Sequence, residues 1–231
     1  AILILKDTNR YTDKPIDRNL AITINGANFS WRLDDTPIDK IIRSSSQFVL
    51  DEMPMQLSNQ SSSQVLMDIN FYAPKGRLIG ICGSSKSGKT SLLLGIMGQL
   101  NQSGGHVAID GSCSYVSEEP SLFEGTLREN IVFGEVFDAS WYYKTIQACR
   151  LNDDLNILPG SDDTDISTVE LTNSQRQKIA LARAVYTNRD INLLDNPLRD
   201  VGTLESTEIF DKAISQAMNG KTVILVSDKI Q

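Results

Sequence analysis

The chain is poor in histidine and cysteine, and it lacks long apolar runs. Its 231 residues include one histidine and three cysteines, and the cysteines at positions 82, 113 and 149 show no metal-ligand spacing. Neither a zinc site nor a disulfide framework is indicated. No apolar run approaches the roughly 20 residues that span a bilayer, and the first residues lack a signal-peptide pattern. We expect three reduced thiols in a cytosolic protein, with no direct membrane insertion by this chain.

Positive charge is also scarce. The 22 Lys and Arg residues face 29 Asp and Glu residues, which gives a formal net charge of -7. Nucleic acids and anionic membranes attract proteins with clustered Lys and Arg side chains, so the composition argues against both as partners. An anionic ligand would have to be met by a local group of donors. The length and the 40% hydrophobic content are sufficient for one domain with a full core.

One segment offers such a group of donors. Residues 83–90 read GSSKSGKT, the G-x-x-x-x-G-K-[ST] spacing of a phosphate-binding P-loop. The run 77–82 before it is typical of a buried strand, and residues 90–97 after it are typical of a helix. Glycines let backbone N–H groups close around phosphate oxygens, the lysine adds a full charge, and the last hydroxyl can bind Mg²⁺. A ligand-free glycine-rich turn is the alternative. The predicted nucleotide-binding residues are Gly83, Ser84, Ser85, Lys86, Ser87, Gly88, Lys89, Thr90 and Ser91.

Strand and helix patterns alternate along the rest of the chain. The expected strands cover 21–31, 65–71, 77–82, 106–109, 114–116, 191–195 and 222–226. The expected helical stretches cover 126–155, 174–186 and 204–218. This alternation predicts an α/β fold with a parallel sheet. We expect residues 1–20 to be a linker, residues 21–231 to be the domain, and about 33–64 to be a serine-rich insertion, because two serine clusters interrupt the pattern there.

Several segments together resemble the nucleotide-binding domain of ATP-binding cassette (ABC) transporters, from about residue 21 to 231. The segments that carry the resemblance are 114–120 and 125–134 (Q-loop and start of the helical subdomain), 171–184 (signature) and 193–198 (Walker B). The sequence of these segments is most similar to the first nucleotide-binding domain of the C subfamily, which holds the multidrug-resistance-associated proteins and the cystic fibrosis channel. The resemblance implies a P-loop NTPase core, an N-terminal antiparallel β element, an inserted helical subdomain at about 121–186, and a truncated C-terminal end.

The resemblance also implies roles for individual residues. Trp31 matches the aromatic residue on which adenine stacks, with a core or rim tryptophan as the alternative. Asp195 matches the aspartate that holds Mg²⁺ near Thr90, with a helix-capping aspartate as the alternative. Phe133 matches an aromatic residue that docks onto the membrane domains, with an ordinary core phenylalanine as the alternative. The residues that match the signature, which contacts ATP held by a partner domain, are Thr172, Asn173, Ser174 and Gln175.

Some positions depart from the family pattern. Asn196 stands where a carboxylate polarises the attacking water, and Asp228 stands where a histidine contacts the γ-phosphate. Glu118 replaces the Q-loop glutamine and retains an oxygen that can bind Mg²⁺. Lys86 replaces a P-loop glycine, which adds a cation and removes backbone freedom. The D-loop aspartate is lost at Gly202, and Asn173 and Ser174 add side chains where the signature has glycines. We therefore assign no catalytic residue.

One function and two alternatives follow from these features. We expect a domain that binds Mg-ATP, dimerises with a second nucleotide-binding domain of the same polypeptide, and drives or gates transmembrane transport with weak or absent hydrolysis. It would contact membrane-spanning domains through the helical subdomain around Phe133, at the cytoplasmic face of a membrane. The first alternative is a working ATPase half whose partner supplies the catalytic base. The second is a nucleotide-free pseudo-cassette that serves as a scaffold.

Overall fold

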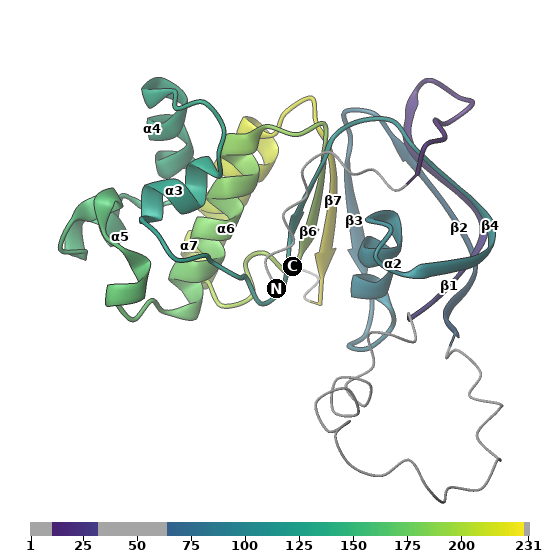
Figure 1. Cartoon of the computed structure of the whole chain (residues 1–231), viewed down its shortest axis with the longest axis horizontal. Helices are drawn as coiled ribbons and strands as arrows, with labels where there is room; N and C mark the ends of the chain where they lie inside the picture. The colour runs from purple at the N-terminus through teal and green to yellow at the C-terminus, as the bar shows by residue number, and fades with distance from the viewer. Residues whose placement is uncertain (1–10, 32–63, 229–231) are drawn as a thin grey trace, which may run out of the picture.

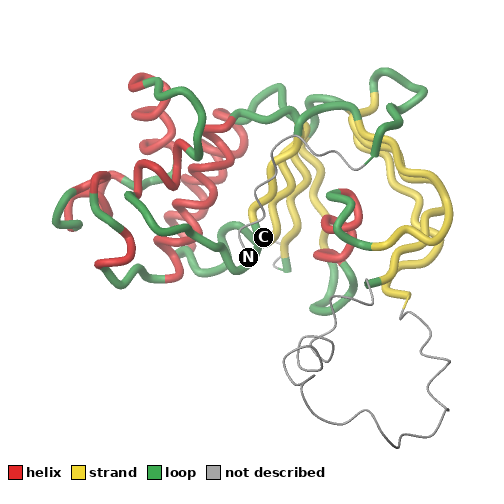
Figure 2. Tube along the Cα trace, in the orientation of Figure 1, coloured by secondary structure: helices red, strands yellow, loops and turns green. Residues whose placement is uncertain are grey.

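The structure is a computed structural model that describes residues 11–31 and 64–228. The described chain forms two sheets and a group of helices beside them (Figures 1 and 2). The predicted insertion at about 33–64 lies almost wholly outside the described residues, as does the first half of the predicted linker. Residues 11–19 lie against the fold, because the Tyr11 hydroxyl donates to Gly95 O at 2.7 Å and Ile109 N donates to Asp13 O at 3.0 Å.

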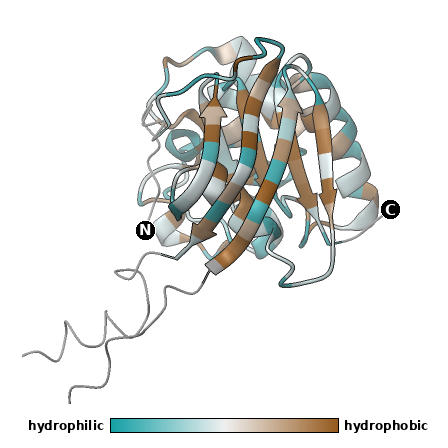
Figure 3. Ribbon diagram, turned by 90° about the vertical axis from the view of Figure 1, so that its right-hand side faces the viewer, coloured by the Kyte–Doolittle hydropathy of each residue, from teal (hydrophilic) through white to brown (hydrophobic). Residues whose placement is uncertain are grey.

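One sheet is antiparallel and contains β1 (Leu20–Ser30), β2 (Gln64–Pro74) and β4 (Asn101–Ile109), in the order β2-β1-β4. Apolar and polar residues alternate along its strands, as Figure 3 shows. The register of β1 on both neighbours shifts near Gly26. There Gly105 has φ +74, and a Cβ on it would lie 2.3 Å from Gly26 O, so no other residue fits. The antiparallel element that the family resemblance implied is present.

The second sheet is parallel throughout and contains β3 (Leu78–Cys82), β7 (Thr222–Ser227), β6 (Ile191–Asp195) and β5 (Cys113–Val116), in the order β3-β7-β6-β5. Every residue of β6 is buried, as expected for a parallel strand covered on both faces. The predicted α/β class with a parallel sheet is confirmed.

Helices cover the two faces of the parallel sheet differently. On one face, α2 (Lys89–Ile96) lies between the two sheets (Figure 1). Its buried Leu93 and Ile96 belong to a core shared with β1, β6 and β7. The other face packs against α6 (Asn173–Thr187), α7 (Thr203–Ile209) and the π-helical η4 (Phe210–Ala217) in a second core. Since both faces are covered, the strand ends are where a ligand can reach this sheet.

The helical stretch expected at 126–155 is divided into α3 (Leu127–Val132), α4 (Ala139–Ala148) and α5 (Asn152–Ile157). Phe133 and Arg150 interrupt it, because both adopt left-handed backbone conformations, with φ +52 and +56. Two 3₁₀ turns, Ser161–Asp163 and Ile166–Thr168, lead on toward α6. None of the helices within residues 11–31 and 64–228 has the length and apolar character needed to cross a membrane.

Candidate nucleotide-binding site

Strand register brings three loops together at the carboxyl edge of the parallel sheet. Cys82 of β3 pairs with Ser227 of β7, and Asp195 of β6 pairs with Val226, also of β7. The P-loop, Asp228 and Asn196 therefore leave the sheet at the same edge. This is the edge at which open parallel sheets bind their ligands.

The backbone of the P-loop depends on left-handed residues. Gly88 has φ +94, which favours glycine because a residue with a Cβ would be strained there, and a Cβ would also displace the end of the Leu66 side chain, 2.9 Å away. Lys86 also adopts a left-handed conformation, with φ +63. For a residue with a side chain this conformation costs about 1–2 kcal/mol. The loop thus forms despite the lysine that stands at a family glycine position.

The N-terminus of α2 has no protein group that caps it. Gly88 offers no side-chain cap, and the first turn contains no acidic residue. By contrast, α3, α4 and α6 each begin with a side-chain cap, and α5 and α7, which lack one, carry acidic residues in the first turn. Free N–H groups together with the helix dipole form an anion site. Thr90 in this turn is exposed, whereas Ser91 is buried.

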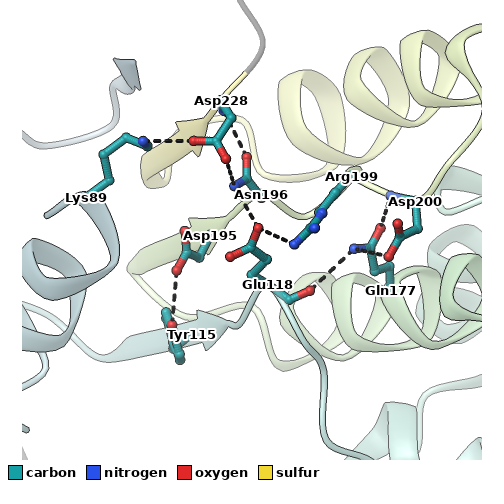
Figure 4. A network of polar contacts seen from close by, with 9 residues as sticks. All are labelled: Lys89, Tyr115, Glu118, Gln177, Asp195, Asn196, Arg199, Asp200 and Asp228. Atoms are coloured by element: carbon teal, nitrogen blue, oxygen red, sulfur yellow. Dashed lines mark hydrogen bonds and ion pairs between the residues drawn. The ribbon is translucent and has the colours of Figure 1, made fainter. Parts of the chain in front are cut away.

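The Lys89 ammonium is saturated by acceptors of the chain itself. It donates to Gly83 O at 2.9 Å and to Ser84 O at 2.7 Å, and it pairs with Asp228 Oδ1 at 2.8 Å (Figure 4). The Lys89 side chain is only 9% exposed. The lysine lowers the pKa of the Asp228 carboxyl below its ordinary value. An ammonium has three donors, so a phosphate must take one of these positions.

Asp195 has a buried carboxylate oxygen without a partner. The residue is 0% exposed, and Oδ2 accepts a 3.4 Å hydrogen bond from the Tyr115 hydroxyl. Among the described residues Oδ1 has no hydrogen-bond partner. Burial raises the pKa of Asp195, and the Thr90 and Tyr115 hydroxyls oppose that shift. An unpaired carboxylate oxygen near a hydroxyl fits Mg²⁺. The described part of the chain holds no cluster of three or more His, Cys, Asp or Glu side chains suited to a metal ion, so phosphate oxygens and water would have to complete the coordination.

Asn196 links two carboxylates at the end of β6. Its Nδ2 donates to Asp228 Oδ2 at 3.2 Å and to Glu118 Oε1 at 3.3 Å, and its Oδ1 accepts from Asp228 N at 3.0 Å (Figure 4). Glu118 also pairs with Arg199 at 2.6 Å. The position that follows the Walker B aspartate therefore presents an amide that is already hydrogen-bonded to its neighbours. Glu118 Oε1 therefore faces a guanidinium and an amide.

The remaining predicted site residues lie on other elements. Trp31 follows the end of β1 and is 41% exposed, so part of the residue is accessible to a ligand. Thr172 and Gln175 form a capping box at the start of α6, with Gln175 N donating to Thr172 Oγ1 at 3.2 Å. Gln175 also donates to Asp154 of α5 at 3.1 Å. No hydrogen bond within the described chain joins these two residues to the P-loop. Asn173 and Ser174 form the first turn of the same helix.

Phe133 lies beside a hollow on the helical side of the molecule. Its ring lies 4.8 Å from the Arg183 guanidinium and 5.9 Å from the Phe123 ring. The neighbouring hollow has a volume of about 450 Å³. The residues that line it are Phe123, Arg128, Glu129, Val132, Gly134 and Phe137. An aromatic, partly charged hollow is available for contact with another chain segment.

Two residues and one ion pair of the site were not predicted from the sequence. Arg199, Tyr115 and the pairing of Lys89 with Asp228 become visible only once the strands are in register. A cation just beyond the Walker B segment was the available signal for Arg199, but nothing in one sequence relates it to Glu118, 81 positions away.

Comparison with known proteins gives a consistent result. The ABC transporter family profile matches residues 66–199, more than half of the chain. ABC transporter C family member 7 of Dictyostelium discoideum is 38% identical over 221 residues, which is 92% of this chain and 17% of that protein. C family member 2 of the same organism is 42% identical over 173 residues, 74% of this chain and 12% of that protein. The cystic fibrosis transmembrane conductance regulator of Danio rerio is 39% identical over 176 residues, which is 75% of this chain and 12% of that protein. The chain thus spans less than a fifth of these relatives.

Proposed function

Because the chain belongs to the ABC transporter family, as a nucleotide-binding domain of the C-family type, we propose that it binds Mg-ATP at the P-loop and has weak or absent hydrolysis. The observation that carries this proposal is the N-terminus of α2, which is uncapped and lies beside Lys89. Backbone N–H groups would hold the phosphates, and Lys89 would supply the full positive charge. Trp31 would stack on the adenine.

The Mg²⁺ ion would be held by Thr90 and Asp195. The unpaired Asp195 Oδ1 is the evidence from the chain itself, because a buried carboxylate oxygen without a donor is costly until a cation approaches it. When bound, the ion would neutralise charge between the phosphate oxygens. Glu118 would contact it only after leaving Arg199.

Weak hydrolysis follows from the chemistry of Asn196. An amide cannot accept a proton from water as a carboxylate does, and both Nδ2 and Oδ1 of Asn196 are hydrogen-bonded to neighbours. Asp228 adds an acceptor where a donor to the γ-phosphate is needed. We therefore propose that this domain binds nucleotide but hydrolyses it weakly or not at all.

We further propose that the domain pairs with a second nucleotide-binding domain and with membrane-spanning domains at the cytoplasmic face of a membrane. The capped start of α6 would present Thr172, Asn173, Ser174 and Gln175 to ATP held by the partner. The hollow beside Phe133 would receive a segment of the membrane domains. The relatives carry the words transporter and transmembrane conductance regulator in their names, which supports a role in driving or gating transport.

A thermal-shift experiment tests nucleotide binding. Mg-ATP at about 100 times its dissociation constant stabilises a protein by about 2.7 kcal/mol, or several degrees in a domain of this size. We expect that shift for this chain, a smaller one without Mg²⁺, and none for Lys89→Ala. Absence of a shift at saturating Mg-ATP would instead support the scaffold alternative.

A phosphate-release assay tests the second part of the proposal. We expect no turnover above background from the chain alone. Robust turnover by the isolated chain would contradict the assignment of Asn196 as a non-catalytic residue. Turnover that appears only with a second nucleotide-binding domain, and falls in Thr172→Ala, would favour the working ATPase half.

A further inference from the structure

Asp228 lies beside the first residue of the P-loop. It follows Ser227, which pairs with Cys82, the residue directly before Gly83. Its Oδ1 lies 2.8 Å from Lys89 Nζ. The Asp228 side chain is 41% exposed and that of Lys89 is 9% exposed. A ligand that approaches from solvent therefore meets the carboxylate before it reaches the ammonium.

The Asp228 carboxylate is held in this position from its other side. Asn196 Nδ2 donates to Asp228 Oδ2 at 3.2 Å, and Asp228 N donates to Asn196 Oδ1 at 3.0 Å. Glu118 accepts from the same Asn196 nitrogen and is itself fixed by Arg199. The negative charge at Asp228 is thus positioned by two elements, the P-loop lysine and the end of β6 (Figure 4).

The charges around this edge disfavour a third phosphate more than the first two. In a P-loop the backbone N–H groups cradle the α- and β-phosphates, and the lysine reaches the β- and γ-phosphates. The γ-phosphate therefore depends on the surroundings of the lysine more than the other two do. Asp228 pairs with Lys89 at 2.8 Å, and its carboxylate carries the same sign of charge as a phosphate that would bind the lysine. In the network of Figure 4, Lys89 and Arg199 are cations, whereas Asp195, Glu118, Asp200 and Asp228 are carboxylates. The exposed Lys86 of the P-loop is a further cation near this edge.

We propose that Asp228 is a specificity-determining residue, which lowers the affinity of the P-loop for nucleoside triphosphates relative to nucleoside diphosphates. The proposal rests on nucleotide binding at the P-loop, as proposed above, and adds the selectivity among phosphate chain lengths. A diphosphate has no γ-phosphate to lie against the Asp228 carboxylate. A triphosphate has to displace the carboxylate from Lys89 and then lie beside it.

The test is a calorimetric titration of Mg-ATP and Mg-ADP into the chain and into two variants at Asp228. Asp228→Asn retains the shape and removes the charge, and Asp228→Ala removes the side-chain contacts as well. The matched control is Asp211→Asn, because Asp211 is exposed on η4 and its substitution changes the net charge equally. Circular dichroism verifies that all variants fold.

We expect the dissociation constant for ATP to fall at least tenfold in both Asp228 variants, while that for ADP changes less than threefold. The control should leave both constants unchanged. A ratio of ATP to ADP affinity that is the same in the original chain and in both variants overturns the specificity role while leaving nucleotide binding intact. If no protein in the series binds either nucleotide, the proposed function itself is wrong.

Discussion

Lys86 provides a test of the P-loop backbone. Its φ of +63 places a residue with a Cβ in the left-handed region, where glycine carries no penalty. The side chain is exposed and forms no hydrogen bond or ion pair with the described residues. We predict that Lys86→Gly stabilises the protein, because it removes strain without removing a contact.

The magnitude follows from two opposing terms. The left-handed conformation costs a non-glycine residue about 1–2 kcal/mol. A glycine gains freedom in the unfolded chain, which offsets about 0.5–1 kcal/mol of that relief. The net effect is a gain of about 0.5–1 kcal/mol in the free energy of unfolding. In a domain of this size the midpoint of thermal unfolding should rise by about 1–4 °C.

Urea denaturation of the ligand-free protein measures this effect. Ser85→Gly is the matched control, because Ser85 does not have a positive φ and gains nothing from the substitution. It should lose about 0.5–1 kcal/mol. Lys86→Asn tolerates the left-handed region and removes the charge, so its nucleotide affinity separates the cation from the backbone. If Lys86→Gly destabilises the protein as much as Ser85→Gly, the loop does not have the conformation described.

Three further predictions concern other residues of the site. Gly88→Ala should cost about 1–2 kcal/mol in the same urea titration, because φ +94 strains a residue with a Cβ, and it should abolish nucleotide binding, because the new Cβ would also displace the end of the Leu66 side chain beside the loop. Gly220→Ala, with φ +79 and open space, should cost about 1 kcal/mol. Nucleotide binding retained by Gly88→Ala would contradict this. Thr172→Ala should lose about 1 kcal/mol by removing the cap of α6, and Thr172→Ser should lose less, by thermal unfolding. The raised pKa of Asp195 means that the native state holds this proton more tightly than the unfolded state, so ionisation destabilises the fold as pH rises above the ordinary value of 3.8. Asp195→Asn should therefore stabilise the ligand-free protein by roughly 1 kcal/mol at pH 7 and hardly at pH 3. The same substitution should abolish the Mg²⁺ dependence of nucleotide binding. A variant that is less stable than the original protein at pH 7 would refute this.

The parts of the fold that the sequence predicted are those with strong local signals. Residues 191–195 are apolar except for Asn192 and the terminal aspartate, and they form β6 as expected. The P-loop spacing fixes a strand, a turn and a helix within 20 residues, and β3 and α2 lie where it places them. Such short-range patterns depend on backbone sterics and burial, which one sequence records directly.

Breaks in helices and contacts between loops could not be read in this way. Phe133 and Arg150 end helical segments although neither is glycine or proline, because packing decides their conformation. The sequence places Asp228 where the family has a histidine that contacts the γ-phosphate, but it does not show the partner of this carboxylate. The register of β3, β7 and β6 then placed it on Lys89. Long-range pairing of this kind has no local signature.

The central claim is that the loop at 83–90 holds nucleotide phosphates through the N-terminus of α2 and Lys89. Equilibrium binding of a fluorescent ATP analogue, in the presence of Mg²⁺, tests it most directly when the chain is compared with Lys89→Met. The account predicts saturable binding to the chain and a loss of at least tenfold in affinity for the variant. Equal affinities, or no saturable binding to either protein, would contradict it.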